Sequence, residues 1–408
     1  MKCRHCHADL TLRFIDLDTA PPSNSYLSAA QLSAPEKWYP LRLYTCTACW
    51  LVQTEDFAGA AELFPSDYAY FSSISSTWLA HAERYVEEVT QRLNLTATSQ
   101  VFEVASNDGY LLQYFKNKGI PCVGIEPTAS TAQAARDKGI EVIEDFFGIS
   151  LAARLAGLGL QADLIVANNV LAHVPDINDF VSGFALLLKP HGVATFEFPH
   201  LLRLVSECQF DTIYHEHFSY LSLTSVCTIF ERNGLCVIDV QDLPTHGGSL
   251  RVFAQSWDTG MRARNPSVLA LLEKERTAGV TSEEYYRALQ FRADQIKDDL
   301  LTFLIQARRE KKIVGGYGAA AKGNTLLNYA GARASLLPWV ADRNPAKQGK
   351  FLPGSRIPIV NEEFLRQRRP DYVLVLPWNL RGEIMAQLSY IRNWGGIFVA
   401  AIPRLELA

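Results

Sequence analysis

The sequence of 408 residues predicts an α/β protein in three parts, and three observations support this. Two Cys-x-x-Cys pairs near the N-terminus predict a small metal-binding ribbon. From Gln100 onward, short apolar segments alternate with amphipathic ones, as in a mostly parallel sheet with helices on both faces. A strand, glycine turn and helix recur at 312–324, which indicates a second α/β domain. We place the three domains at residues 1–72, 73–255 and 256–408.

The composition is that of a globular protein. Hydrophobic residues make up 48% of the chain and charged residues 20%, which argues against extensive disorder. There is no run of 18 or more uncharged apolar residues, so no membrane partner is expected. The formal net charge of -4 gives no bulk electrostatic reason to bind nucleic acid. The first residues lack the apolar core of a signal peptide, so we expect a cytoplasmic protein with reduced thiols. We also expect a monomer.

The two cysteine pairs have the spacing at which thiolates hold a tetrahedral ion. They are Cys3-x-x-Cys6 and Cys46-x-x-Cys49. Common ribbons separate their pairs by roughly 15 to 20 residues, so the longer segment here must be an inserted loop that returns the chain. Four thiolates leave no coordination position for water, which predicts a structural Zn²⁺. Two reduced pairs without a metal are the alternative.

An aromatic and hydroxyl-rich connector, residues 63–73, follows the ribbon and leads into a helix expected over 75–95. Its Tyr68 either faces a pocket or packs between domains.

The middle of the chain predicts a doubly wound sheet. The expected strands are Gln100–Val104, Pro121–Ile125, Glu141–Ile143, Asp163–Ala167, Val193–Phe198, Cys236–Gln241 and Ser249–Gln255, with a helix near Leu223–Asn233 before the last two. Seven strands ending in an antiparallel pair are the arrangement of class I methyltransferases. Ligands of such sheets bind at the carboxyl ends of the central strands, so the residues there are the candidate site.

The turn after the first strand predicts a site for a sulfonium amino acid. Its candidate residues are Glu103, Ala105, Asn107, Asp108 and Gly109. Glycine permits a tight turn, and the acidic groups would repel a pyrophosphate. We therefore expect S-adenosylmethionine as the cofactor.

Residues after the next strands extend this site. Glu126 ends the second strand, where a carboxylate can accept both hydroxyls of an adenosine ribose. Phe146 follows the third strand and could flank an adenine ring. Asn168 and His173 follow the fourth strand on the same side.

Residues 209–220 contain a cluster that no apolar core would favour. Tyr214, His215, Glu216, His217 and Tyr220 are costly to bury without partners. Proton transfer is the function that such groups suggest. A surface loop that happens to be rich in His and Tyr is the alternative.

Three motifs, taken with the cysteine pattern, resemble one enzyme family. They are Glu-x-x-Ser-Asn-Asp-Gly at 103–109, Tyr-His-Glu-His-Phe-Ser-Tyr at 214–220 and His-Gly-Gly-Ser-Leu-Arg at 246–251. Together they resemble the deoxysugar C-methyltransferases over essentially the whole chain. The resemblance implies that S-adenosylmethionine methylates C-3′ of a dTDP-linked 4-keto-deoxysugar. It also implies a Rossmann-like third domain that helps to hold the nucleotide-sugar. The first motif departs from the common methyltransferase pattern, because Ala105 and Asn107 replace two glycines.

The chemistry of such a reaction assigns roles within the cluster. A carbon next to a ketone becomes nucleophilic only after it loses a proton, so a base near neutral pKa is needed. We expect His217 to be that base, and the resulting enolate to take the methyl group directly. By resemblance, Tyr214, Glu216 and His173 orient the imidazole or bind sugar oxygens, and Tyr68 joins them from the connector. In an extended segment Tyr214 and His217 would face opposite sides, so a turn within the run is required.

Two further segments carry candidate substrate contacts. His246 lies in the link between the last two strands and lines the pocket or belongs to a plain hairpin. The glycine turn at 315–324 fits Gly-x-Gly-x-x-Ala, and Gly318, Lys322 and Asn324 are its candidates for gripping a diphosphate. A structural glycine turn is the alternative.

Between these segments, residues 266–312 predict helices that act as packing or interdomain scaffold. Apolar residues recur there at helical spacing, namely Leu269, Leu272, Tyr286, Leu289, Ile296, Leu300, Leu301 and Leu304.

Two other functions compete with the methyltransferase. A nicotinamide-dependent oxidoreductase could use the C-terminal glycine turn. A zinc-ribbon protein that binds nucleic acid would need a basic face, which the balanced charge disfavours.

Overall fold

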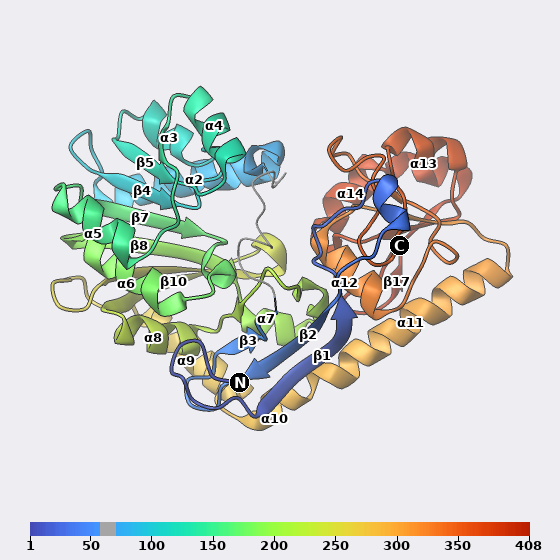
Figure 1. Ribbon diagram of the computed structural model, residues 1–408, viewed down its shortest axis with the longest axis horizontal. Coiled ribbons are helices and arrows are strands. Elements are labelled where there is room, and N and C mark those ends of the chain that lie inside the picture. Colours follow the sequence, from blue (N-terminus) through green and yellow to red (C-terminus); the bar gives the residue numbers. More distant parts are fainter. Residues whose placement is uncertain (58–70) are drawn as a thin grey trace.

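The computed structural model describes residues 1–57 and 71–408 and contains sheets of four, seven and six strands (Figure 1). Tyr68 lies outside the described residues. None of the helices in these two ranges is long and apolar enough to cross a membrane.

The seven-stranded sheet forms the middle of the molecule and contains all seven strands that the sequence predicts for the middle domain. Its strands are β4 (Val101–Val104), β5 (Cys122–Ile125), β6 (Glu141–Ile143), β7 (Ala162–Asn168), β8 (Leu188–Pro199), β10 (Leu235–Leu243) and β11 (Ser249–Ser256). The order is β10-β11-β8-β7-β4-β5-β6, and β11 runs antiparallel to both neighbours. The strand order reverses between β4 and β7, which is where a doubly wound sheet binds its ligand. The class I methyltransferase topology is thereby confirmed.

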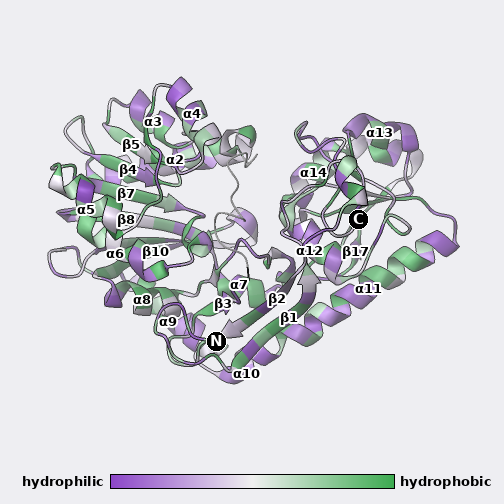
Figure 2. Ribbon diagram, in the orientation of Figure 1, coloured by the Kyte–Doolittle hydropathy of each residue, from purple (hydrophilic) through white to green (hydrophobic). Residues whose placement is uncertain are grey.

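Helices cover both faces of this sheet. They are α2 (Ser76–Leu93), α3 (Leu112–Asn117), α4 (Ala129–Asp137), α5 (Ile149–Gly157), α6 (Ile177–Leu187) and α8 (Leu223–Arg232). The short helix α7 (Leu201–Ser206) packs instead in the core of the N-terminal and C-terminal sheets. Successive residues of one strand enter different cores. In β7, Leu164 packs on the face that α2 and α3 cover, and Ile165 packs on the face that α5 and α6 cover. The central strand β7 is buried on both faces, and its residues 164–167 form a continuous hydrophobic segment (Figure 2).

The four-stranded sheet joins the N-terminal segment to the middle of the chain. It consists of β1 (Leu12–Ala20), β2 (Tyr39–Thr45), β3 (Val52–Thr54) and β9 (Ser219–Tyr220), in that order. The fourth strand, β9, comes from the segment that contains the His and Tyr cluster. The N-terminal sheet therefore takes a strand from the sequence that we expected in the middle domain.

The six-stranded sheet forms the C-terminal domain. Its strands are β12 (Val314–Tyr317), β13 (Val340–Ala341), β14 (Ile359–Val360), β15 (Tyr372–Val375), β16 (Ile397–Ala400) and β17 (Glu406–Leu407), in the order β14-β13-β12-β15-β16-β17. Only β17 is antiparallel to its neighbour. Helices α12 (Ala321–Tyr329), α13 (Glu362–Arg368) and α14 (Arg381–Gln387) accompany the sheet.

Helices α9 (Pro266–Ala278), α10 (Glu283–Arg287) and α11 (Leu289–Arg309) connect the two larger domains. One face of α11 is buried in a core that also contains residues of β1, β2 and the C-terminal sheet. The expected scaffold is present, and Figure 1 shows α11 running below the C-terminal domain. The packing expectation is wrong for Leu269, which is 61% exposed, because α9 presents that side to solvent.

Candidate active site

The backbone turns within the His and Tyr cluster, between β8 and β9. The His217 N–H donates to the Tyr214 carbonyl oxygen over 2.9 Å, and the two rings lie 4.0 Å apart between centroids. His215 points away, with Nε2 3.2 Å from the Pro40 carbonyl oxygen and its ring against Tyr39. The required turn is present, so Tyr214 and His217 share one side.

Hydrogen bonds fix the form of the His217 ring. Its Nδ1 lies 3.0 Å from the Thr212 carbonyl oxygen, which can only accept, so Nδ1 carries the proton. Nε2 is then the nitrogen that can take a proton from a ligand. Burial and the neighbouring His173, whose ring centroid is 4.6 Å away, hold the pKa of His217 well below its ordinary value. The ring is therefore neutral, as a base must be before it acts, but its pKa is lower than the near-neutral value expected for the base, because burial disfavours the imidazolium.

His173 and Glu216 lie beside this ring. His173 donates from Nδ1 to the Glu216 carbonyl oxygen over 2.7 Å, and burial lowers its pKa to about 4. The Glu216 carboxylate is 1% exposed and accepts from Asn24 Nδ2 over 2.9 Å. Burial raises the pKa of Glu216 to about 7, and the Asn24 side chain and backbone oppose that rise. Glu216 thus titrates near neutral pH.

The C-terminal domain adds Lys322 to the same region. Lys322 lies in the first turn of α12, and its Nζ donates to Asn379 Oδ1 over 2.7 Å and sits 4.7 Å from the centroid of the Trp378 ring. Burial lowers the pKa of Lys322, and its charge lowers the pKa values of His217 and His246. One ammonium group therefore acts on two histidines of the middle domain.

His246 lies in the link between β10 and β11, as expected. It has a positive φ of 55°, and its ring is 5.2 Å from that of Trp78. Its Nε2 lies 3.3 Å from Asn169 Nδ2, so the amide donates to the imidazole. Burial and then Lys322 lower the pKa of His246 to about 4.

The other candidates of the C-terminal glycine turn contact protein groups. Gly318 has a φ of +88°, and a Cβ there would meet Pro377 at 2.4 Å. Asn324 is buried and donates from Nδ2 to the Ser23 carbonyl oxygen over 2.6 Å. A direct substrate contact by Gly318 or Asn324 stays a prediction.

The turn after β4 has the shape of a ligand-binding glycine turn despite its two replacements. Ala105, Asn107 and Gly109 have φ values of +55°, +50° and +73°. Glu103 is 1% exposed, and neither of its carboxylate oxygens has a partner at hydrogen-bond distance among the described residues, although the Tyr110 hydroxyl faces the group. Burial raises the pKa of Glu103 well above its ordinary value.

Residues on the neighbouring strands continue this edge. Asn168, at the end of β7, also has a buried Oδ1 with no partner at bonding distance in the described ranges. The Glu126 carboxylate accepts from the N–H groups of Asn107 and Thr128, each over 2.9 Å. Asp108 pairs with Lys138 at 3.3 Å, and Phe146 is 64% exposed at the same edge. Unpaired acceptors and acidic groups here fit a ligand that carries N–H donors, hydroxyls and positive charge, as S-adenosylmethionine does.

Some residues of the site are not apparent from the sequence. Glu197 of β8 is fully buried and accepts from Arg251 over 2.8 Å, from Thr245 over 2.9 Å and from His81 of α2 over 2.9 Å. A carboxylate inside the apolar run at 193–198 is the signal that could have found it. This cluster holds the end of β8 against the loop that carries His246.

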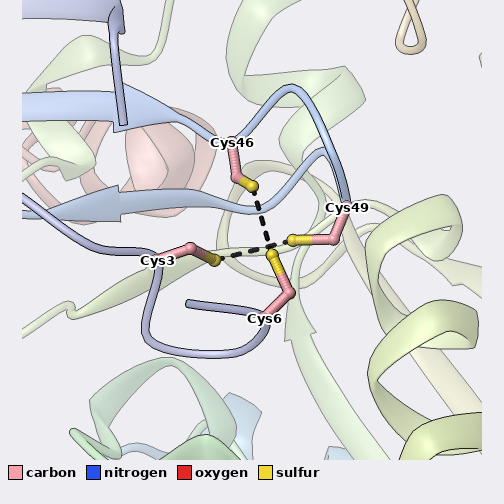
Figure 3. Close-up of side chains that lie close together, drawn as sticks. All are labelled: Cys3, Cys6, Cys46 and Cys49. Atoms are coloured by element: carbon pink, nitrogen blue, oxygen red, sulfur yellow. Dashed lines mark hydrogen bonds between the residues drawn. The ribbon is translucent and has the colours of Figure 1, made fainter. Parts of the chain in front are cut away.

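The four predicted cysteines meet at one point (Figure 3). All four sulfur atoms lie within 4.8 Å of one another, with Cys3 3.6 Å from Cys49 and Cys6 3.5 Å from Cys46. Tetrahedral zinc with bonds of about 2.3 Å needs sulfurs about 3.8 Å apart, so the cluster fits the ion. Cys46 donates a hydrogen bond to the Cys3 thiolate, which raises the pKa of Cys46 to about 11, so all four cysteines ionise together only with a cation present.

Family profiles match the chain in three consecutive parts. Residues 3–64 match a domain described as zinc binding, residues 78–240 a methyltransferase domain, and residues 244–403 the C-methyltransferase C-terminal domain. The C-methyltransferase NovU of Streptomyces niveus is 35% identical over 402 residues, which are 98% of this chain and 95% of that protein.

Solved structures resemble the chain more weakly. Magnesium protoporphyrin IX methyltransferase from Synechocystis with bound SAH is 16% identical, covers 44% of this chain and 83% of its own, and has a TM-score of 0.36. The glycopeptide N-methyltransferase MtfA is 15% identical, covers 43% of this chain and 96% of its own, and has a TM-score of 0.34. These values carry no statement about function.

The full-length relative and the three matched parts therefore show the family, and the four-cysteine cluster shows the metal site. The chain belongs to the C-methyltransferase family, whose members use S-adenosylmethionine and carry an N-terminal zinc-binding domain.

Proposed function

We propose that this C-methyltransferase methylates C-3′ of a dTDP-linked 4-keto-deoxysugar and that His217 is the base. The sugar and the position follow from the resemblance of the Tyr214–Tyr220 motif to the deoxysugar enzymes. The methyl group is the chemistry that bound S-adenosylmethionine supplies. This proposal takes precedence over the nicotinamide and nucleic-acid alternatives, because the family is that of C-methyltransferases.

The observation that carries the proposal is the geometry of the Tyr214–His217 turn. It presents a neutral imidazole whose Nε2 can accept a proton, since Nδ1 donates to Thr212. Tyr214 lies against the same ring and could donate to the enolate oxygen. We infer that the Lys322 ammonium group, in the first turn of α12 in the nucleotide-type domain, pairs with the diphosphate of the substrate.

The substrate assay tests the whole proposal. The enzyme, zinc-loaded and supplied with labelled S-adenosylmethionine, is incubated with a panel of dTDP-linked keto-deoxysugars, and NMR locates the labelled carbon. We expect label at C-3′ of a 4-keto sugar. Label on oxygen or nitrogen, or transfer only to acceptors that are not sugars, would contradict the proposal.

The variant His217→Asn tests the base. Loss of a positioned base lowers turnover by about 10²–10⁴-fold, while calorimetry should find both ligands still bound. His215→Asn is the matched control, because this neighbour faces Pro40 on the other side of the turn. Normal turnover in His217→Asn would show that another group removes the proton.

A further inference from the structure

The loop between the two cysteine pairs extends far beyond the zinc site. We call residues 21–38 the insert. Leu27 and Phe351 of the C-terminal domain exchange both backbone hydrogen bonds, over 2.9 and 2.8 Å. The Tyr26 hydroxyl donates to the Ala319 carbonyl oxygen over 2.7 Å. Figure 1 shows this N-terminal segment lying against the C-terminal domain. A zinc ribbon needs no such connection, so the insert serves another purpose.

One residue of the insert reaches the active site. Asn24 Nδ2 donates to Glu216 Oε2 over 2.9 Å, and the Asn24 backbone N–H faces the same carboxylate and lowers its pKa. Two local hydrogen bonds fix the backbone here, from Ser25 N to Pro22 O over 3.1 Å and from Tyr26 N to Asn24 O over 2.9 Å. Asn24 is therefore held rigidly while its donors point at Glu216.

The other groups around Glu216 do not replace this contact. Burial raises the pKa values of Tyr26 and Tyr220, and the charge of Glu216, which they face from the insert and from β9, adds to this rise. His173 contacts the Glu216 backbone carbonyl, and His217 is the next residue. Burial favours the protonated acid, and the two Asn24 donors are the groups that oppose it. Each donor bond to a buried carboxylate stabilises its charged form.

From these contacts we propose that Asn24 is a positioning residue of the active site, which fixes the orientation of the Glu216 carboxylate and favours its ionised form. The insert is then a part of the active site that the N-terminal domain supplies. The inference rests on the proposed function, because it gives Glu216 a role in binding sugar oxygens or orienting His217.

The experiment compares Asn24→Ala with Ser25→Ala in the full-length, zinc-loaded enzyme. Ser25 is the exposed neighbour in the same insert and serves as the matched control. Loss of the Asn24 side-chain donor should raise the pKa of Glu216, so the acidic limb of the kcat–pH profile should move to higher pH by about 0.5–1 unit. The activity deficit should be largest near pH 6 and shrink above pH 8. A purely structural defect would lower activity equally at all pH values.

A direct titration gives a second readout without turnover. The enzyme labelled with ¹³C at the glutamate carboxyl carbons is titrated by NMR, and the Glu216→Gln variant identifies the Glu216 signal. We expect its midpoint to rise in Asn24→Ala and to stay unchanged in Ser25→Ala. Asn24→Gln keeps an amide donor, so the midpoint of Glu216 should rise less in this variant than in Asn24→Ala. It replaces Asn24→Ala if that variant loses its zinc or its fold.

The outcomes separate this inference from the proposed function. If Glu216→Gln turns over normally, the role of Glu216 in the reaction is wrong, and the titration alone decides whether Asn24 sets its charge. If Glu216→Gln is impaired, but Asn24→Ala moves neither the titration midpoint nor the acidic limb, Asn24 is not a positioning residue.

Discussion

At the scale of single residues, Gly109 combines a left-handed backbone with a close contact. Its φ is +73°, and a Cβ would lie 2.4 Å from Ile140 Cδ1 and 3.2 Å from Ala135 Cβ. Gly109→Ala should lower the free energy of unfolding by about 2–4 kcal/mol, from backbone strain and overpacking together. Urea denaturation and calorimetric binding of S-adenosylmethionine measure the effect.

Gly119→Ala is the matched control for that prediction. Gly119 has nearly the same φ, +70°, but nothing lies within 4 Å of the added Cβ. Gly119→Ala should lower the free energy of unfolding only through backbone strain, by about 1–2 kcal/mol, and should leave binding of S-adenosylmethionine unchanged. If both variants lose the same free energy of unfolding, the Ile140 side chain moves away from the added Cβ without cost.

The same turn shows what a residue pattern can predict. Asn107 tolerates a positive φ, so Asn107 and Gly109 together indicate a ligand-binding turn even without the common glycines. Ala105 gives no such indication, since alanine in the left-handed conformation costs roughly 1–2 kcal/mol. The surrounding strands impose that conformation, and nothing in the local sequence reveals it.

At the scale of elements, periodicity predicted the strands of the central sheet well, because their apolar runs are bounded by glycines and polar residues. It could not predict the turn at Tyr214–His217. Tyr220 Oη accepts from the Tyr214 N–H over 3.3 Å, and His215 contacts β2 across the N-terminal sheet. Pro40 is 175 residues from His215 in the sequence, so the residue types predicted the chemistry of the cluster but not the direction in which each side chain points.

The zinc site should influence activity through these elements. Gln53 of β3 donates to Cys3 Sγ over 3.3 Å, and β3 pairs with β9, which begins two residues after His217. Cys46→Ser should therefore lose zinc, measured by elemental analysis, and lose turnover by about tenfold or more as the catalytic turn loosens. Cys122→Ser, at a half-buried thiol outside the cluster, should retain both zinc and turnover. Full activity without zinc would refute this coupling.

At the scale of the whole molecule, the site is assembled from segments that are distant in sequence. Asn24 and Glu216 are 192 residues apart, and Trp378 Nε1 donates to Asp211 Oδ2 over 2.8 Å across 167 residues. Each of these side chains is ordinary within its own segment. Local patterns therefore indicated Lys322 as a candidate, through its glycine turn, but gave no signal for Asn24, Asp211 or Trp378.

Lys322 electrostatically connects the C-terminal domain to the catalytic turn. Its charge lowers the pKa values of His217 and His246 and opposes the burial that raises the pKa of Asp211 to about 6. Lys322→Gln should therefore raise all three pKa values, because a cation near each group is removed. NMR titration of the histidine ring signals measures the pKa values of His217 and His246. The control for net charge is Lys118→Gln, at an exposed lysine of the middle domain.

The KM of Lys322→Gln for the nucleotide-sugar should also rise, since the Lys322 ammonium group is the proposed diphosphate contact. A bound diphosphate would offset the Lys322 charge in the same way, so substrate binding itself should make His217 more basic. Unchanged histidine titrations in Lys322→Gln would disprove this connection.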